Sequence, residues 1–275
     1  MIPEELKKVM ILALDMGNTN IKIGVVDTID KVIEERVTTN RNKSSLEYGQ
    51  DILAVLNFHH IPVSAIEGAI LSSVVPPLTG IVATAIRKSV GFEPIIVNCG
   101  MNMDISFHKY QYPKGIGPDR IVGMEAAYYY YKAPCICVNM GTATTVTIVD
   151  EDAEFCGGVI MPGMNTSLDS LIANASMLPE ISLEDPGRVI SQNTVHSIRS
   201  GIIYGNAAQI DGIIERMEME YGKKCNIVAT GGMARFCIPY GKNADRIVRD
   251  DALLMKGLLR LYELNKHDSV RCSID

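Results

Sequence analysis

The chain contains one strand–turn–strand phrase twice, and this repeat constrains its fold more than any other feature. Residues 11–27 read ILALDMGNTNIKIGVVD, and residues 135–150 read CICVNMGTATTVTIVD. Each copy has an apolar strand, an Asp or Asn, a Gly-containing turn rich in Thr and Asn, and a second apolar strand that ends in Asp. Two copies, one near the start and one near the middle, predict two domains of the same design that face each other across a cleft.

Strand-like and helix-like segments alternate around both copies. In the first half, strands are expected at 9–14, 21–26, 31–37, 65–74 and 93–98, and helices at 44–59 and 78–90. In the second half, strands are expected at 134–141, 146–150, 157–163 and 226–232, and helices at 167–178, 194–222 and 250–264. The pattern predicts a duplicated α/β fold, with domains at 1–125 and 126–275 and a helix at 122–132 between them.

Composition excludes several classes of protein. The net charge of −6 and the lack of a long basic run argue against nucleic-acid binding, which relies on clustered Lys and Arg. The first ten residues carry acids and lack the apolar run of a signal peptide, and no apolar stretch approaches the roughly 18 residues of a membrane span. Seven cysteines without C-x-x-C spacing indicate reduced thiols rather than a metal site. A cytoplasmic protein is the simplest expectation.

The first turn has the residues of a phosphate-binding loop. Asp15 ends a strand, Gly17 permits close approach of the backbone, and Asn18 and Thr19 can donate to phosphate oxygens. The carboxylate suits Mg²⁺, which takes a few carboxylates together with substrate phosphates. The alternative is a plain hairpin turn, since Gly and Asn are common turn formers. The second copy of the motif favours the phosphate interpretation.

The second turn, at 139–145, repeats this pattern with hydroxyl groups and begins with Asn139 where the first copy has Asp15. A third Gly-rich turn, at 230–234, follows the strand NIVA and could pass close to a nucleotide base or ribose. The third signal is weak on its own, because Gly-Gly after a strand is frequent in α/β proteins.

The segment at 110–120 is a loop interrupted by Gly and Pro residues that runs directly into a helix. Asp119 is expected in the first helical turn, where backbone N–H groups stabilise its ionised form, and Arg120 beside it supplies a cation. Such a carboxylate can accept a hydroxyl proton as the oxygen attacks phosphorus. The alternative is that Asp119 is only a charge at a helix N-terminus. The paired turns favour the catalytic role.

Taken in order, these motifs resemble the type III pantothenate kinases, a branch of the superfamily of acetate and sugar kinases, Hsp70 and actin. The resemblance spans most of the chain, because the motifs recur in the family's order and spacing. They are DMGNTNIK, SSVVPPL at 72–78, Tyr-x-x-Pro to Gly-x-Asp-Arg, MGTATT, GGVIMPG, ASMLP, NTVHSIRSG and TGGMA.

The resemblance implies a role for each matching residue. ATP would be bound by Asp15, Met16, Gly17, Asn18, Thr19, Asn20, Ile21, Lys22 and Thr142. Pantothenate would be bound by Tyr110, Gly117, Pro118, Asp119, Arg120 and Thr194, the last of which lies near the dimer partner in the family. Asp119 would be the proton acceptor. The implied reaction moves the γ-phosphoryl group of ATP, with Mg²⁺ near Asp15, to the primary hydroxyl of pantothenate. This is the first step towards coenzyme A, and the family works as a homodimer.

Three positions depart from the family pattern. Asn139 stands where the family has an Asp that binds a monovalent cation, usually K⁺ or NH₄⁺, and an amide lacks the negative charge that holds such an ion. Tyr112 stands where the family usually has Asn, and Ala175 where a Thr often precedes Leu-Pro. The cation site is therefore expected to be weakened or lost. Tyr112 and Ala175 could alter the pantothenate pocket or the dimer contact.

Two alternatives remain open beside an active pantothenate kinase. Asn139 motivates a diverged, non-catalytic paralogue with a regulatory or partner-binding role, although the retained Asp15, Asp119 and Arg120 speak against it. Tyr112 and Ala175 motivate a related kinase or phosphohydrolase that acts on another small molecule.

Overall fold

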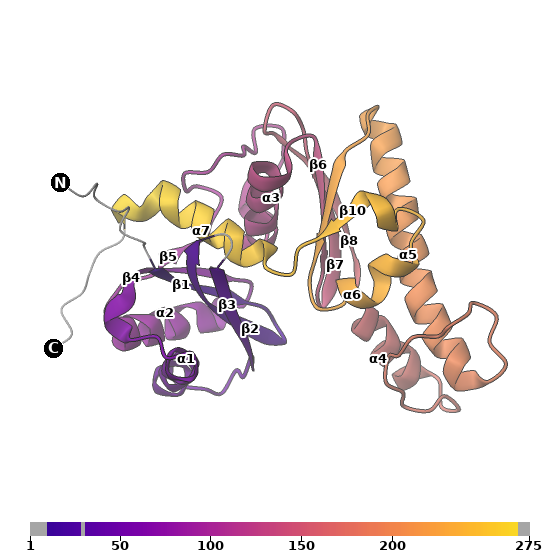
Figure 1. Ribbon diagram of the computed structural model, residues 1–275, viewed down its shortest axis with the longest axis horizontal. Coiled ribbons are helices and arrows are strands. Elements are labelled where there is room, and N and C mark those ends of the chain that lie inside the picture. The colour runs from indigo at the N-terminus through magenta and orange to yellow at the C-terminus, as the bar shows by residue number, and fades with distance from the viewer. Residues whose placement is uncertain (1–9, 29–30, 269–275) are drawn as a thin grey trace. The chain divides into compact units, whose positions relative to one another are not determined.

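The computed structural model describes residues 10–28 and 31–268, and its strands form two five-stranded mixed sheets (Figure 1). The predicted lack of a signal peptide rests mainly on residues 1–9, which lie outside this range. Among the described helices, none combines the length and the apolar character that crossing a membrane requires.

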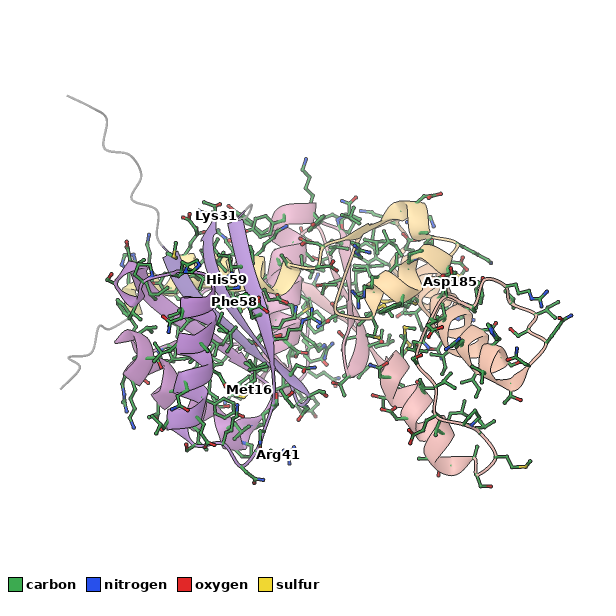
Figure 2. The ribbon with its side chains drawn as sticks, turned by 60° about the horizontal axis from the view of Figure 1, so that its bottom comes forward. Met16, Lys31, Arg41, Phe58, His59 and Asp185 are labelled. Atoms are coloured by element: carbon green, nitrogen blue, oxygen red, sulfur yellow. The ribbon has the colours of Figure 1, made fainter. Side chains whose placement is uncertain are left out.

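The first sheet has the strand order β3-β2-β1-β4-β5. Its strands are β1 (Met10–Met16), β2 (Asn20–Thr28), β3 (Lys31–Thr38), β4 (Ile66–Ser73) and β5 (Ile95–Ile96). The strands β1, β2 and β3 are antiparallel neighbours, whereas β4 runs parallel to β1 and β5 parallel to β4. Figure 2 shows Met16 and Lys31 towards opposite ends of this sheet. Met16 lies at the end that carries the first turn.

Helices cover both faces of the first sheet (Figure 1). α1 (Ser45–Phe58) and α2 (Pro76–Val90) pack on the face that carries Leu12, Leu14, Ile21 and Ile23. A capping box starts α1, since Ser44 and Glu47 bond each other's backbone N–H groups. The C-terminal helix α7 (Leu253–Asn265) packs on β1, β2 and β4.

The second sheet has the order β10-β9-β6-β7-β8. Its strands are β6 (Cys135–Met140), β7 (Ala143–Val149), β8 (Phe155–Pro162), β9 (Asn226–Thr230) and β10 (Ile247–Arg249). One face packs against three helices in a core that includes Ile136, Val138, Met164 and Ile203. These helices are α4 (Met164–Asn174), α5 (Thr194–Tyr221) and α6 (Ala234–Cys237).

The two sheets share one topology, which confirms the predicted duplicated α/β fold. In each, a three-stranded antiparallel meander is extended by two parallel strands beside its first strand. The repeated sequence phrase forms the equivalent hairpins, β1–β2 in the first sheet and β6–β7 in the second.

The chain divides into two compact units that are each discontinuous in sequence. Unit 1 contains the described residues up to Asp104, then Tyr112–Ala126, and those from Ala252 onward. Unit 2 contains Ile105–Gln111 and Ala127–Asp251. The helix α3 (Pro118–Tyr131) therefore contributes its first part to unit 1 and its last part to unit 2.

Polar contacts tie α7 to unit 1. Arg260 of α7 binds the Asp104 carboxylate through Nε at 2.7 Å and Nη2 at 3.0 Å. The Asn265 amide donates to the Asn102 carbonyl over 2.7 Å. A bidentate pair of this kind fixes orientation as well as position. These contacts fix α7 to residues 102–104 of the same unit.

Candidate active site

The first turn is an exposed hairpin between β1 and β2. The Gly17 amide donates to the Asn20 carbonyl over 3.0 Å, and the Thr39 hydroxyl donates to the Gly17 carbonyl over 2.7 Å. Asn18 and Thr19 at the tip are exposed. Hydrogen bonds at the base hold the turn in place, and its tip offers the amide and hydroxyl groups expected of a phosphate-binding loop.

A row of polar side chains crosses the first sheet next to this turn. Asp15 of β1 is the cross-strand partner of Ser72 on one side and of Lys22 on the other. The Ser72 hydroxyl donates to Asp15 Oδ1 over 2.9 Å. Beyond Lys22 lies its partner Arg36 of β3. Side chains opposite one another on the same face of a sheet are close enough to interact, so an acid and two bases gather beside the turn.

Asp119 lies in the first turn of α3, as predicted from the sequence. Its carboxylate folds back over Gly117, where an added Cβ would stand only 2.6 Å from Asp119 Oδ1. A side chain at position 117 would thus displace the carboxylate. The Arg120 backbone N–H and guanidinium both favour the ionised form of Asp119. Burial outweighs them, however, and raises the pKa of this carboxyl above its ordinary value.

Asp15 and Asp119 interact electrostatically within unit 1. Burial first, and then the negative charge of Asp119, raise the pKa of Asp15 from 3.8 to about 6, against the opposing effects of Lys22 and Ser72. A buried carboxylate whose ionisation is disfavoured by a second carboxylate nearby is typical of a site that receives a cation or a proton.

The carboxylate of Asp15 fits a divalent cation that is shared with a substrate. Within residues 10–28 and 31–268, no group of three or more His, Cys, Asp or Glu side chains could hold a metal ion. An ion at Asp15 would therefore take its other ligands from water and from substrate phosphates, which is the usual arrangement for Mg²⁺.

The second turn lies in unit 2, between β6 and β7. The Gly141 amide donates to the Ala143 carbonyl over 3.1 Å. The Thr142 carbonyl accepts from the Gly163 amide at 3.0 Å and from the Thr166 hydroxyl at 2.7 Å. The motif GGVIMPG, which ends at Gly163, thus braces the second turn from the start of α4. Thr142 itself is exposed.

The third Gly-rich turn packs directly on the second. Gly231 has a left-handed backbone (φ 95°), and an added Cβ would lie 2.5–2.7 Å from backbone atoms of Met140. The Met233 amide donates to the Met140 carbonyl over 3.3 Å. The structure therefore gathers the motifs MGTATT, GGVIMPG and TGGMA at one end of the second sheet.

We expect Gly231→Ala to destabilise the protein by about 2–4 kcal/mol, because left-handed strain adds to a backbone collision. Gly222, the C-cap of α5, has a similar φ of 85° with nothing within 4 Å of an added Cβ. Gly222→Ala introduces the left-handed strain without the collision and should lower the free energy of unfolding by about 1 kcal/mol. Urea unfolding of both variants measures the difference, and equal losses would contradict the close packing of Gly231.

Tyr110 belongs to unit 2, where its ring packs on Phe155 with centroids 4.8 Å apart. The residue before it, Lys109, reaches Asp150 over 2.9 Å, and Glu154 accepts from the Ser106 hydroxyl. The Ser106 bond is the largest of the effects that lower the pKa of the Glu154 carboxyl to about 2. The loop before Tyr110 is thereby fixed to the β7–β8 hairpin.

Thr194 and Asn139, two other candidates, also lie in unit 2. Thr194 is the first residue of α5, exposed beside the cap formed by Asn193, whose side chain accepts from the His196 amide over 2.9 Å. Asn139 is half-buried on β6 and is the cross-strand partner of Thr145 on one side and of Thr230 on the other. These two cross-strand partners offer hydroxyl oxygens rather than carboxylates.

The structure assigns the predicted site residues to two groups. Residues 15–22 and 117–120 lie together in unit 1, whereas Tyr110, Thr142 and Thr194 lie in unit 2. Sequence reasoning missed the pairing of Ser72 with Asp15 and of Glu34 with Lys22. The motif SSVVPPL contains Ser72 and was a signal for its pairing with Asp15. The pairing of Glu34 with Lys22 depends on the register of two strands.

The two other departures from the family pattern occupy loops. Tyr112 is 76 % exposed. Ala175 terminates α4, where its extended backbone ends the helix four residues before Pro179 and earlier than the predicted limit at 178. Neither residue contributes to the core of its unit.

Comparison with known proteins places the chain in a family. The family model described as type III pantothenate kinase matches residues 11–216, a range that includes both repeated hairpins and Asp119. The chain belongs to this family. A type III pantothenate kinase of Moorella thermoacetica is 38% identical over 256 residues, 93% of this chain and 100% of the relative. One from an Exiguobacterium species is 37% identical over 94% of this chain and 100% of its own length.

Solved structures support the fold. A protein of Campylobacter jejuni described as a conserved putative Baf family transcriptional activator aligns with a TM-score of 0.57 at 18% identity, over 94% of this chain and 100% of that one. The ROK hexokinase of Thermus thermophilus aligns with a TM-score of 0.53 at 11% identity, over 94% of this chain and 100% of its own. At such identities the similarity concerns architecture alone, and it places this kinase in an actin-like, sugar-kinase fold.

Proposed function

We propose that this type III pantothenate kinase transfers the γ-phosphoryl group of ATP to the primary hydroxyl of pantothenate and forms 4′-phosphopantothenate, the first step of coenzyme A synthesis. The observation that carries the proposal is a pair of carboxylates, the buried Asp15 and the half-buried Asp119, beside the exposed turn at 17–20. Family membership supplies the two substrates.

Asp119 is the general base in this proposal. Burial raises its pKa, which makes it a stronger base than an ordinary Asp. It would orient the hydroxyl of pantothenate and accept its proton as the oxygen attacks phosphorus. Arg120 supplies positive charge beside the base.

The first turn and Lys22 would hold the phosphate chain of ATP. Backbone N–H groups and a buried ammonium supply donors that need no reorganisation when charge develops. Asp15 would bind Mg²⁺ directly or through water, and the ion, when bound with ATP, neutralises phosphate charge. Positioning and charge stabilisation provide most of the acceleration in phosphoryl transfer.

Residues of unit 2 complete the proposed assignments. Thr142, in the braced second turn, would contact ATP, and Tyr110 and Thr194 would contact pantothenate. The positions of two of these residues are held by local contacts, which supports the assignments. Tyr110 packs on Phe155, and Thr194 starts a helix whose cap is formed by Asn193. A homodimer is proposed from the family, and exposed apolar side chains of unit 2, such as Met177 (93 %) and Ile190 (83 %), are consistent with one. A cytoplasmic location remains a prediction from the sequence.

We expect little or no dependence of the rate on K⁺, because Asn139 and its partners Thr145 and Thr230 offer no negative charge to hold a cation. Rates in K⁺ and in Na⁺ should agree within about twofold, because a site without a negative charge holds neither ion firmly. Initial rates at constant ionic strength measure this. The variant Asn139→Asp serves as the comparison, and a steep rise with K⁺ in the wild-type chain would show that the site persists.

A panel of small alcohols tests the substrate assignment. Purified protein, Mg²⁺-ATP and each alcohol in turn should give phosphoryl transfer to pantothenate above all others. Turnover of another alcohol with none of pantothenate would indicate a related kinase. ATP binding with no turnover of any alcohol would indicate the non-catalytic paralogue that Asn139 motivates.

A further inference from the structure

Lys22 has a defined ionic partner outside the first turn. Its Nζ lies 3.2 Å from each carboxylate oxygen of Glu34, which is on the neighbouring strand β3. Both side chains are largely buried, with exposures of 11% for Lys22 and 17% for Glu34. An ion pair screened from water in this way is far less weakened by solvent and salt than a surface pair.

Glu34 is itself held from its other side. Arg36, two residues along β3, directs Nε and Nη2 to Glu34 Oε1 at 3.4 Å each. Glu34 therefore bridges Lys22 of β2 and Arg36 of β3, two bases that are cross-strand partners. Because Arg36 compensates the charge of Glu34, the carboxylate can orient Lys22 without strongly repelling an incoming anion.

We propose that Glu34 is a positioning residue that fixes the Lys22 ammonium beside Asp15 for contact with the phosphate chain of ATP. This inference rests on the proposed function, in which Lys22 binds ATP. A lysine has three N–H donors, and two oxygens of Glu34 engage its ammonium from one side, which leaves donor capacity for phosphate. The long lysine side chain would otherwise sample many rotamers, and ordering it before ATP arrives removes that entropic cost from binding.

The neighbouring Glu35 provides a matched control. Successive strand residues face opposite sides of a sheet, and Glu35 binds His59 Nε2 over 2.9 Å at the end of α1, where Figure 2 labels that histidine. Glu35→Gln therefore removes the same charge from the same strand without touching Lys22.

The test measures ATP affinity by calorimetry in Glu34→Gln, Glu35→Gln, Lys22→Met and the double variant Lys22→Met/Glu34→Gln. We expect Glu34→Gln to weaken ATP binding by about tenfold, Glu35→Gln to leave it unchanged, and the KM for pantothenate to stay within about twofold in both. In the Lys22→Met background, Glu34→Gln should have no further effect, because Glu34 acts through Lys22.

Unchanged or tighter ATP binding in Glu34→Gln would overturn the inference, and so would an equal loss in both backgrounds. Glu34→Asp keeps the charge at a shorter reach and should recover part of the affinity, which guards against a folding defect in the Gln variant. Phosphorylation of pantothenate by the wild-type chain, assayed on the same preparation, reports separately on the proposed function.

Discussion

Replacing Asp119 with Asn should lower the rate of pantothenate phosphorylation by about 10²–10⁴-fold, the usual contribution of a general base. The amide keeps the shape of the carboxylate over Gly117 but cannot accept the hydroxyl proton. Binding of ATP should persist, because Asp119 is assigned to pantothenate and not to the phosphate chain. Single-turnover rates and calorimetry separate the two effects.

Asp51→Asn is a suitable control for that experiment. Asp51 also belongs to unit 1, but it lies on α1, away from the polar row. Its carboxylate pairs with the Lys43 ammonium over 2.6 Å. Its loss should leave turnover within about twofold of the wild type, since partly exposed ion pairs contribute little. Near-normal turnover in Asp119→Asn would refute the assignment of the base.

Asp15→Asn should abolish most activity and yet stabilise the fold. The pKa of Asp15 is raised from 3.8 to about 6, chiefly by burial, so holding its charge inside unit 1 is unfavourable. Roughly two pK units correspond to at most ~3 kcal/mol of unfolding free energy. An uncharged amide avoids this cost and still accepts a hydrogen bond from Ser72. Residues that are needed for activity often lower the stability of the fold.

The pH dependence of this gain follows from the direction of the shift. Between about pH 4 and pH 6 the folded wild type retains a proton that the unfolded chain has lost, so its stability falls as the pH rises. The gain in Asp15→Asn should be near zero below pH 4 and complete above pH 6. Urea unfolding in EDTA, at several pH values, measures it. A variant less stable than the wild type at pH 7.5 would contradict the proposed cost of burying the Asp15 charge.

The hairpins and the duplication could be predicted from the sequence because they depend on local patterns. Residues 11–27 and 135–150 alternate apolar strands around Gly-containing turns, and the structure places each pair of strands in register around its turn. The placement of Asp119 in a first helical turn is likewise local, although the helix expected at 122–132 begins earlier, at Pro118.

Contacts between distant segments could not be predicted from such patterns. The pairing of Lys22 with Glu34 depends on the register of β2 and β3, and a slip of one residue would direct Glu35 to that face instead. The hydrogen bonds of α7 with Asp104 and Asn102 join residues that lie over 150 positions apart. Short strands such as β10 (Ile247–Arg249) carry too few residues for a periodic signal.

The most direct test of the account is whether the purified protein, given Mg²⁺-ATP and pantothenate alone, forms 4′-phosphopantothenate. Mass spectrometry and phosphorus NMR identify the product and the phosphorylated oxygen. The account predicts one phosphoryl group on the primary hydroxyl, with equal formation in Na⁺ and K⁺. Intact binding of ATP without any phosphorylated pantothenate would contradict it.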